Sequence, residues 1–165
     1  DELGIPLEER KLNQKYAREA AQVSATASRL MTQVDNLASQ LQQLETSLST
    51  VRNVDQAVKD KLKAVREKLG EIQKVYYRTP EGQTQYRQLY FNALRGGTVG
   101  EVVMRAGGGG MGGGYPGAPT QMQIDKIAEA RAFLAPLIEK MKEITEKDVP
   151  DLNKLLAEKN IPFIK

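Results

Sequence analysis

The stretch YAREAAQVSATASRLMTQVDNLASQLQQLETSLSTV, residues 16–51, decides the fold of this chain. Its apolar residues recur at alternating steps of four and three, the spacing that keeps one apolar seam along one side of a long helix. The residues between them are mostly polar, so the opposite face is exposed to water. Because such a helix cannot bury its seam alone, the rest of the chain is expected to cover it. The seam positions are Tyr16, Ala20, Val23, Ala27, Leu30, Val34, Leu37, Leu41, Leu44, Leu48 and Val51.

We predict one helix over residues 7–51, roughly 65 Å long at ~1.5 Å per residue. Pro6 stands at a position where proline is tolerated, at the start of the helix. Asn53 tolerates the left-handed backbone conformation that ends helices. Asp55 can cap the next helix, with Lys59 as its ion-pair partner.

A second helix is predicted over residues 55–77, again with apolar residues in steps of four and three. The competing interpretation is a single uninterrupted helix over residues 7–77, since neither Pro nor Gly interrupts the turn region. We favour a hairpin, because a lone helix of that length would need another molecule to cover its seam. The apolar stripe of the second helix is Val58, Leu62, Val65, Leu69, Ile72 and Tyr76.

Residues 78–119 are expected to form an aromatic segment followed by a Gly-rich loop. The segment 83–94 is expected to form a short helix whose aromatic side chains cover one end of the fold as a lid. Eleven of the fourteen glycines lie between Gly96 and Gly117, which indicates a flexible surface loop. The aromatic cluster singled out in this segment is Tyr86, Tyr90 and Phe91.

The last helix is predicted over residues 120–160. Thr120 and Gln123 match the Thr-x-x-Gln capping box, and Asn160 is expected to end the helix. Pro136 and Pro150 each remove an amide donor and are expected to bend or restart the helix. The predicted apolar stripe is Ile124, Ile127, Leu134, Ile138, Met141, Ile144, Val149, Leu152, Leu155 and Leu156.

Together these patterns predict an all-α fold: an elongated antiparallel three-helix bundle, coiled-coil-like, with a Gly-rich loop before the last helix. A length of 165 residues fits one module over residues 1–165. No apolar run approaches the ~20 residues of a membrane-spanning helix. Since the sequence begins with Asp1 and shows no signal-peptide pattern, we expect a processed, excised or trimmed product.

The composition excludes several classes of chemistry. The chain has no Cys and no His, which rules out thiolate nucleophiles, zinc sites with nitrogen or sulfur ligands, and the commonest general base near neutral pH. A formal net charge of +3, spread along the chain, does not form the basic stripe that nucleic-acid binding requires. We therefore expect no cofactor and no nucleic-acid partner.

Other features have ordinary structural interpretations. The Gly-rich loop lacks the Gly-Lys-Ser/Thr ending of a phosphate-binding P-loop and is interpreted as a linker. Glu143, Glu146 and Asp148 are interpreted as a solvated helix face, with Glu143 and Lys147 as an i,i+4 pair, because no calcium-loop motif surrounds them. We thus predict no catalytic residue and no metal site.

Three segments resemble a known family. The runs APT at 118–120, DVPDLNKLL at 148–156 and NIP at 160–162 are similar to the end of large bacterial sortilin-like proteins, which are built from BNR-repeat β-propellers and are often labelled glycosyl hydrolases. In that family a helical region of two long helices, a loop and a final helix closes the chain. The resemblance implies secretion or location in the cell envelope, and it implies that substrate chemistry belongs to the propellers.

The expected function is therefore a non-catalytic structural or protein–protein interaction module, the C-terminal helical domain of a secreted sortilin-like propeller protein. Its partner would be another protein or its own propeller domains. The alternative is a self-assembling subunit of an extracellular filament, surface layer or larger complex, in which case the chain is a homo-oligomer; a hydrolase fragment is a weaker alternative. The candidate interaction residues are the seam leucines Leu37, Leu41, Leu44 and Leu48 and the aromatic side chains Tyr86, Tyr90 and Phe91.

Overall fold

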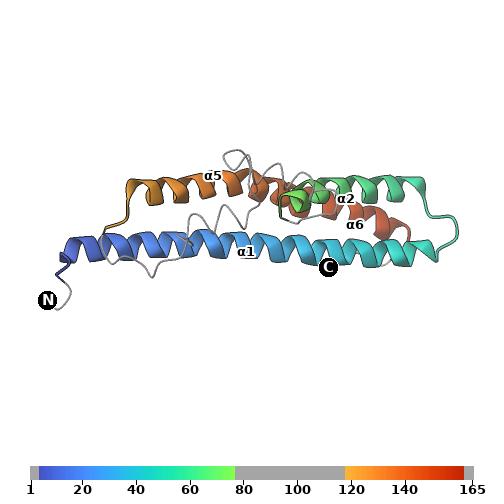
Figure 1. The fold of residues 1–165 in the computed structure, drawn as a ribbon. Helices are drawn as coiled ribbons and strands as arrows, with labels where there is room; N and C mark the ends of the chain where they lie inside the picture. Colours follow the sequence, from blue (N-terminus) through green and yellow to red (C-terminus); the bar gives the residue numbers. More distant parts are fainter. Residues whose placement is uncertain (1–3, 77–117, 162–165) are drawn as a thin grey trace. The chain divides into compact units, whose positions relative to one another are not determined.

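The computed structural model describes residues 4–76 and 118–161, and these residues are helical with no strand among them (Figure 1). The expectation of an all-α fold is confirmed for this part of the chain. The predicted lid, the Gly-rich loop, and the tail after residue 161 lie outside the described residues. The elements are α1 (Leu7–Ser49), α2 (Gln56–Tyr76), α5 (Gln121–Glu143), a π-helical segment η1 (Ile144–Asp148) and α6 (Val149–Glu158).

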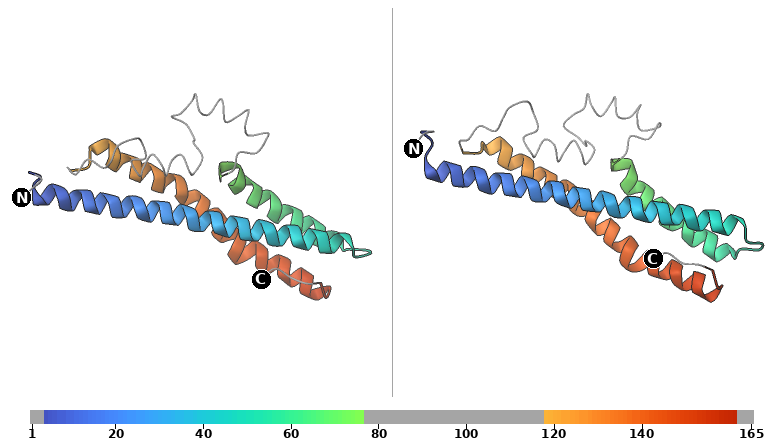
Figure 2. Two further views of the ribbon diagram at one scale, coloured as in Figure 1. Left: turned by 60° about the horizontal axis from the view of Figure 1, so that its bottom comes forward. Right: turned by 90° about the horizontal axis from the view of Figure 1, so that it is seen from below.

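The chain divides into two compact units. Of the described residues, unit 1 comprises 4–29 and 118–136, and unit 2 comprises 30–76 and 137–161. Within unit 2, α2 runs back beside the second part of α1 and lies closest to η1 and α6 (Figures 1 and 2). Within unit 1, the first part of α1 lies beside the first part of α5.

The seam of α1 is buried at every position from Val23 to Leu48. Tyr16 and Ala20 are half-buried. Val51 differs from the prediction, with 45% of its surface exposed, because α1 ends at Ser49 and Val51 lies in the turn after it. The seam therefore supplies most of the α1 contribution to the core, at about 1.5–3 kcal/mol for each fully buried large side chain.

The break between α1 and α2 is the turn that the sequence predicts. Asn53 has a φ of 61°, in the left-handed region. Asp55 caps α2, since its carboxylate accepts a hydrogen bond of 2.9 Å from the Ala57 amide. Its ion-pair partner is Lys159 at 3.0 Å rather than the predicted Lys59, because the end of α6 lies beside this turn.

The two ends of the last helical region also follow their sequence signals. Thr120 and Gln123 form the reciprocal capping box at the start of α5: the Thr120 amide donates to Gln123 Oε1 at 2.8 Å, and the Gln123 amide donates to Thr120 Oγ1 at 3.3 Å. Asn160 ends α6 with a φ of 55°. The amide of Ile161 donates to the Leu156 carbonyl at 3.0 Å, and the amide of Asn160 donates to the Ala157 carbonyl at 3.1 Å, which together form a Schellman motif.

The apolar stripe of α5 to α6 differs from the prediction at several positions. Leu137 is buried while Ile138 is 36% exposed, and Asp148 is buried while its neighbour Val149 is only half-buried. At Asp148 the reason lies in the steps between buried residues: from Ile144 onward they are four, four and four, too long for a helix of 3.6 residues per turn. The wider π turn of η1 takes up the extra length and keeps later apolar residues on the buried side. The buried residues of this region are Ile127, Ala130, Leu134, Leu137, Met141, Ile144, Asp148, Leu152 and Leu156.

Candidate functional site

The seam leucines predicted as interaction residues lie inside the fold. Leu37, Leu41, Leu44 and Leu48 are all buried, with Leu41 fully inaccessible to solvent. They build the core of unit 2 together with the stripe of α2, which is buried from Val58 to Ile72. The structure thus gives these leucines a packing role within the chain, and direct contact of their side chains with a partner stays a prediction. Tyr86, Tyr90 and Phe91 lie outside the described residues.

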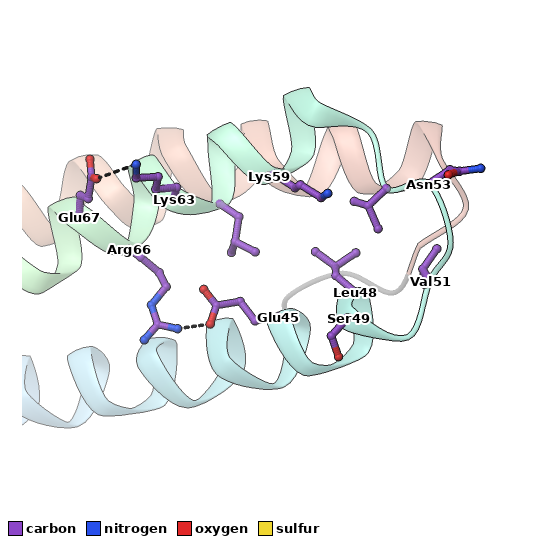
Figure 3. Close-up of a pocket in the computed structure, with 11 residues that line it drawn as sticks. Glu45, Leu48, Ser49, Val51, Asn53, Lys59, Lys63, Arg66 and Glu67 are labelled. Carbon is purple, nitrogen blue, oxygen red and sulfur yellow. Dashed lines mark hydrogen bonds and ion pairs between the residues drawn. The ribbon is translucent and has the colours of Figure 1, made fainter.

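An open groove lies between α1 and α2 next to the turn that joins them (Figure 3). Its volume is about 890 Å³. Its apolar residues come from the ends of both helices and from the turn, and polar residues line its two sides. We call it the turn groove, and its lining residues are Glu45, Leu48, Ser49, Val51, Asn53, Val54, Lys59, Leu62, Lys63, Arg66 and Glu67.

The charged residues of the turn groove differ in how firmly they are paired. Arg66 of α2 and Glu45 of α1 form an ion pair between the two helices. Lys63 and Glu67 form an i,i+4 pair at 3.9 Å, with 77% and 68% of their side chains exposed, so this pair contributes little to stability. Lys59 has no ion-pair partner within the described part of the chain. The groove therefore has one ion pair between the helices, one long exposed pair within α2, and one lysine, Lys59, with no ion-pair partner in the described residues.

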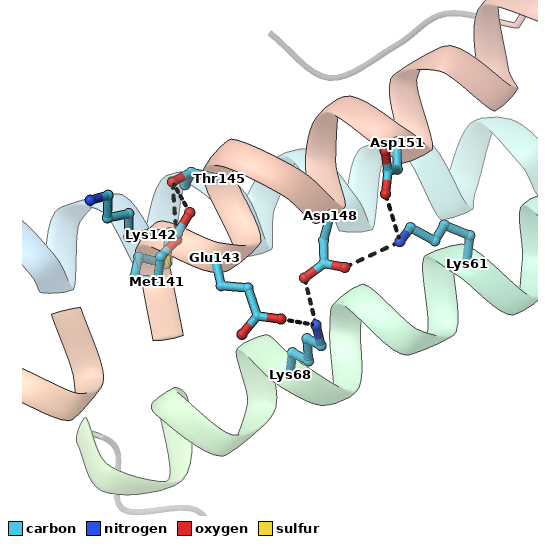
Figure 4. A network of polar contacts seen from close by, with 8 residues as sticks. All are labelled: Lys61, Lys68, Met141, Lys142, Glu143, Thr145, Asp148 and Asp151. Carbon is cyan, nitrogen blue, oxygen red and sulfur yellow. Dashed lines mark hydrogen bonds and ion pairs between the residues drawn. The ribbon is translucent and has the colours of Figure 1, made fainter. Parts of the chain in front are cut away.

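A second polar cluster joins α2 to η1 and α6 through the carboxylate of Asp148 (Figure 4). Asp148 Oδ1 accepts a hydrogen bond from Lys61 Nζ at 3.1 Å, and Oδ2 accepts one from Lys68 Nζ at 2.8 Å. Lys68 also donates to Glu143 at 2.9 Å, and Lys61 lies 3.5 Å from Asp151. The result is an alternating chain of five charges, and we call it the Asp148 network.

The Asp148 network shifts the pKa of two of its members. Burial on its own raises the pKa of Asp148, but the hydrogen bonds and positive charges of Lys68 and Lys61 outweigh it, and the pKa lies below its ordinary value. The hydrogen bonds to Asp148 and Glu143 raise the pKa of Lys68. Both shifts favour the charged forms of the two groups, as expected for an ion pair.

The backbone of η1 positions Asp148. The amide of Val149 donates to the carbonyl of Ile144, five residues earlier, which is the π-helical pattern. Pro150 has no amide proton to donate, and its ring is incompatible with a regular helical turn before it. The wide turn relieves this conflict and places Asp148 at the buried position between Ile144 and Leu152.

Sequence reasoning missed the Asp148 network. It interpreted Glu143 and Asp148 as part of a solvated face, whereas Asp148 is 5% exposed and Glu143 pairs with Lys68 instead of Lys147. A usable signal was present, since Asp148 stands four residues after Ile144 and four before Leu152, in line with the apolar stripe. The two lysines stand seven residues apart on α2, which places both on one face of that helix.

Unit 1 has a more polar groove of about 450 Å³ between α1 and α5. Arg131 of α5 lies 3.8 Å from Glu19 of α1 across it, a weak and partly exposed pair. The other lining residues are surface residues of α1, and we assign this groove no role. They are Lys11, Gln14, Lys15, Arg18 and Gln22.

Among the described residues, no cluster of three or more Asp or Glu side chains is placed to hold a metal ion. Within the same residues, no helix is both long enough and apolar enough to cross a membrane. No protein-family model matches the chain, and comparisons with characterised proteins and with solved structures gave no significant match.

Proposed function

We propose that this chain is a non-catalytic structural and protein–protein interaction module, built as an elongated antiparallel three-helix bundle of coiled-coil character. The observation that carries the proposal is the burial of the α1 seam from Val23 to Leu48. In unit 2 this seam shares its core with apolar stripes on α2, η1 and α6. A chain whose apolar surface is used in this way forms a stiff scaffold that presents its turns and outer faces to other molecules.

The charged residues of unit 2 support the same proposal. Several of them join different helices, which fixes the register of one helix against another. The pairs are Arg66 with Glu45, Lys68 with Asp148, Lys140 with Glu71 at 3.2 Å, and Lys159 with Asp55. Each exposed pair contributes little energy, but together with the buried Asp148 they oppose sliding of the helices. Resistance to sliding is what a load-carrying or spacing element requires.

We further propose that this module is the C-terminal helical domain of a secreted sortilin-like propeller protein, located outside the cell or in the cell envelope. The support is the resemblance of residues 118–120, 148–156 and 160–162. Residues of these runs have definite structural positions, since Thr120 caps α5, Asp148 links α2 to η1, and Asn160 ends α6. In this proposal the partner is a protein, either the propeller domains of the same polypeptide or a separate chain.

Three measurements test the proposed function. The gene sequence upstream of Asp1 should encode BNR-type propeller repeats, and a different neighbouring domain would contradict the family assignment. The isolated chain should show no turnover of glycosides or peptides, and any reproducible turnover abolished by a point substitution would contradict a non-catalytic role. Sedimentation at several concentrations should give a monomer, whereas growing assemblies would favour the self-assembling subunit.

A further inference from the structure

The turn groove is a place in unit 2 where part of the apolar surface is exposed. Leu48 and Leu62 line the groove and are 7% and 5% exposed. Val51 is 45% exposed at its edge, although it continues the apolar spacing of α1. Half-buried Val54 adds to the same surface from the turn. An apolar side chain placed here would bury surface on both sides at about 25 cal/mol per Å².

Two lysines of α2 stand beside this apolar surface. Lys59 and Lys63 stand four residues apart on α2, so they lie on one side of the groove about one helical turn apart (Figure 3). Lys59 has no ion-pair partner in the described residues, and Lys63 has only a long, solvent-exposed contact with Glu67. The acids that line the groove are Glu45, already paired with Arg66, and Glu67.

We propose that the turn groove binds an amphipathic helix of a partner protein, with apolar side chains on its inner face and carboxylates one turn apart on the edge that faces Lys59 and Lys63. This inference rests on the proposed function and names the chemistry of the partner. A helix fits a groove between two helices, because regular helices offer no unpaired backbone groups for an added strand. A phosphate-rich ligand fits less well, because four apolar residues and the carboxylates of Glu45 and Glu67 line the groove.

Because the chain has no cysteine, a single introduced cysteine gives one defined site for a fluorescent label. Ser49→Cys places the label in the turn groove. Ser47→Cys is the matched control, since Ser47 is also exposed near the end of α1, does not line the groove, and like Ser49 donates its hydroxyl to a backbone carbonyl. The probe is a synthetic helical peptide with leucines on one face and glutamates at i and i+4 beside them.

Two further peptides separate the contributions of charge and apolar contact: one carries Lys in place of Glu, and the other carries Ala in place of Leu. We expect the Leu/Glu peptide to change the signal of the Ser49→Cys label in a saturable way and to leave the Ser47→Cys label unchanged. The double variant Lys59→Glu/Lys63→Glu should weaken its binding at least tenfold, and binding should weaken as salt is added. Lys154→Glu, on the exposed surface of α6, should have no effect.

Isothermal titration with the unlabelled chain repeats the comparison without the dye. The inference is overturned if the Leu/Glu peptide does not bind, if the Leu/Lys peptide binds equally well, or if both labels respond alike. Circular dichroism of each variant shows whether the helices are intact. The proposed function is contradicted by different results, namely turnover by the unmodified chain or its self-assembly. A failed peptide experiment therefore rules out this binding site without contradicting the proposed function.

Discussion

Among the described residues, Asp148 is the one charged residue that is buried. Ion pairs with Lys61 and Lys68 join it to α2. We predict that Asp148→Asn lowers the free energy of unfolding by about 1–3 kcal/mol, because the amide oxygen can accept from only one lysine while the amide NH2 group, a donor, faces the other ammonium. The loss stays below that of a fully buried pair, since Lys68 is 42% exposed. Urea unfolding followed by circular dichroism measures it.

The matched control is Asp151→Asn. Asp151 contacts the same Lys61, at 3.5 Å, but is 55% exposed. Its substitution should change stability by no more than about 0.5 kcal/mol. Equal effects of the two substitutions would mean that burial of Asp148 does not matter and that the network is an ordinary surface cluster.

The pKa shifts of the same network predict how stability depends on pH. The pKa of Asp148 is lowered on folding, so its contribution is present above about pH 4, the unfolded value, and is lost as pH falls through the folded pKa. The pKa of Lys68 is raised, so its contribution is present below about pH 10 and is lost as pH rises through the folded pKa. Urea midpoints measured from pH 2 to pH 11 should show a plateau with a fall at each end.

Asp148→Asn should flatten the acid side of that profile without removing it, because the pKa of Asp55 is also lowered, by the Ala57 amide and by Lys159. A profile of Asp148→Asn parallel to that of the unmodified chain would contradict the assignment of the acid limb to Asp148.

Asn53 allows the chain to turn between α1 and α2. With a φ of 61°, a residue with an ordinary side chain is strained there, whereas glycine is not. We predict that Asn53→Ala lowers the free energy of unfolding by about 1 kcal/mol and that Asn53→Gly changes it by less. Thermal unfolding of the two variants under one buffer condition compares them directly, and equal stability would show that the turn adopts another conformation in solution.

At the scale of single helices, the π turn of η1 accommodates one extra residue. Deleting Lys147 together with Pro150→Ala should restore a regular helix and still leave Leu152 and Leu156 on the buried side. Deleting Lys63, another exposed lysine, in the regular helix α2, should rotate Val65 and Leu69 by about 100° away from the core, since each residue turns a helix by that angle. We predict a much larger loss of helicity and melting temperature for the Lys63 deletion, measured by circular dichroism.

The comparison is decisive because both deletions remove a surface lysine. If the Lys147 deletion, combined with Pro150→Ala, unfolds the chain as fully as the Lys63 deletion, the segment 144–148 is not a removable insertion. Pro150→Ala alone serves as the reference, so that the effect of removing Lys147 is separated from the effect of replacing the proline.

The helices follow from the sequence because local signals specify them. The spacing of apolar residues predicts α1 and α2, and a capping box marks the start of α5. Asn53 and Asn160, both at positive φ, mark the turn after α1 and the end of α6. The register of α5 to α6 did not follow, because the π turn shifts the buried side by one residue at Asp148. The ion-pair partners did not follow either, since Lys159 and Lys61 reach their acids across the fold rather than along one helix.

The turn groove could not be predicted from the sequence either. The sequence spacing places Leu48, Val51 and Leu62 in the apolar stripes of the first two helices. It therefore predicts that Val51 is buried. Only the end of α1 at Ser49 places Val51 in the turn and leaves it open. Lys59 was assigned to Asp55, and its availability follows from the arrival of Lys159 at that carboxylate.

For the whole molecule, the decisive claim is that η1 and α6 cover the apolar stripe of α2 within unit 2. A chain that stops at Glu143 lacks Ile144, Leu152 and Leu156, each 1% exposed or less, and also lacks Asp148. At about 1.5–3 kcal/mol for each apolar side chain, the loss is comparable with the total stability of a small domain. We predict that this shortened chain binds the dye ANS, unfolds with a broad transition and self-associates through the uncovered stripe of α2. A chain that stops at Ile161 is the control and should behave as the full one; a monomeric, dye-free and cooperatively folded 1–143 chain would show that α6 does not cover α2.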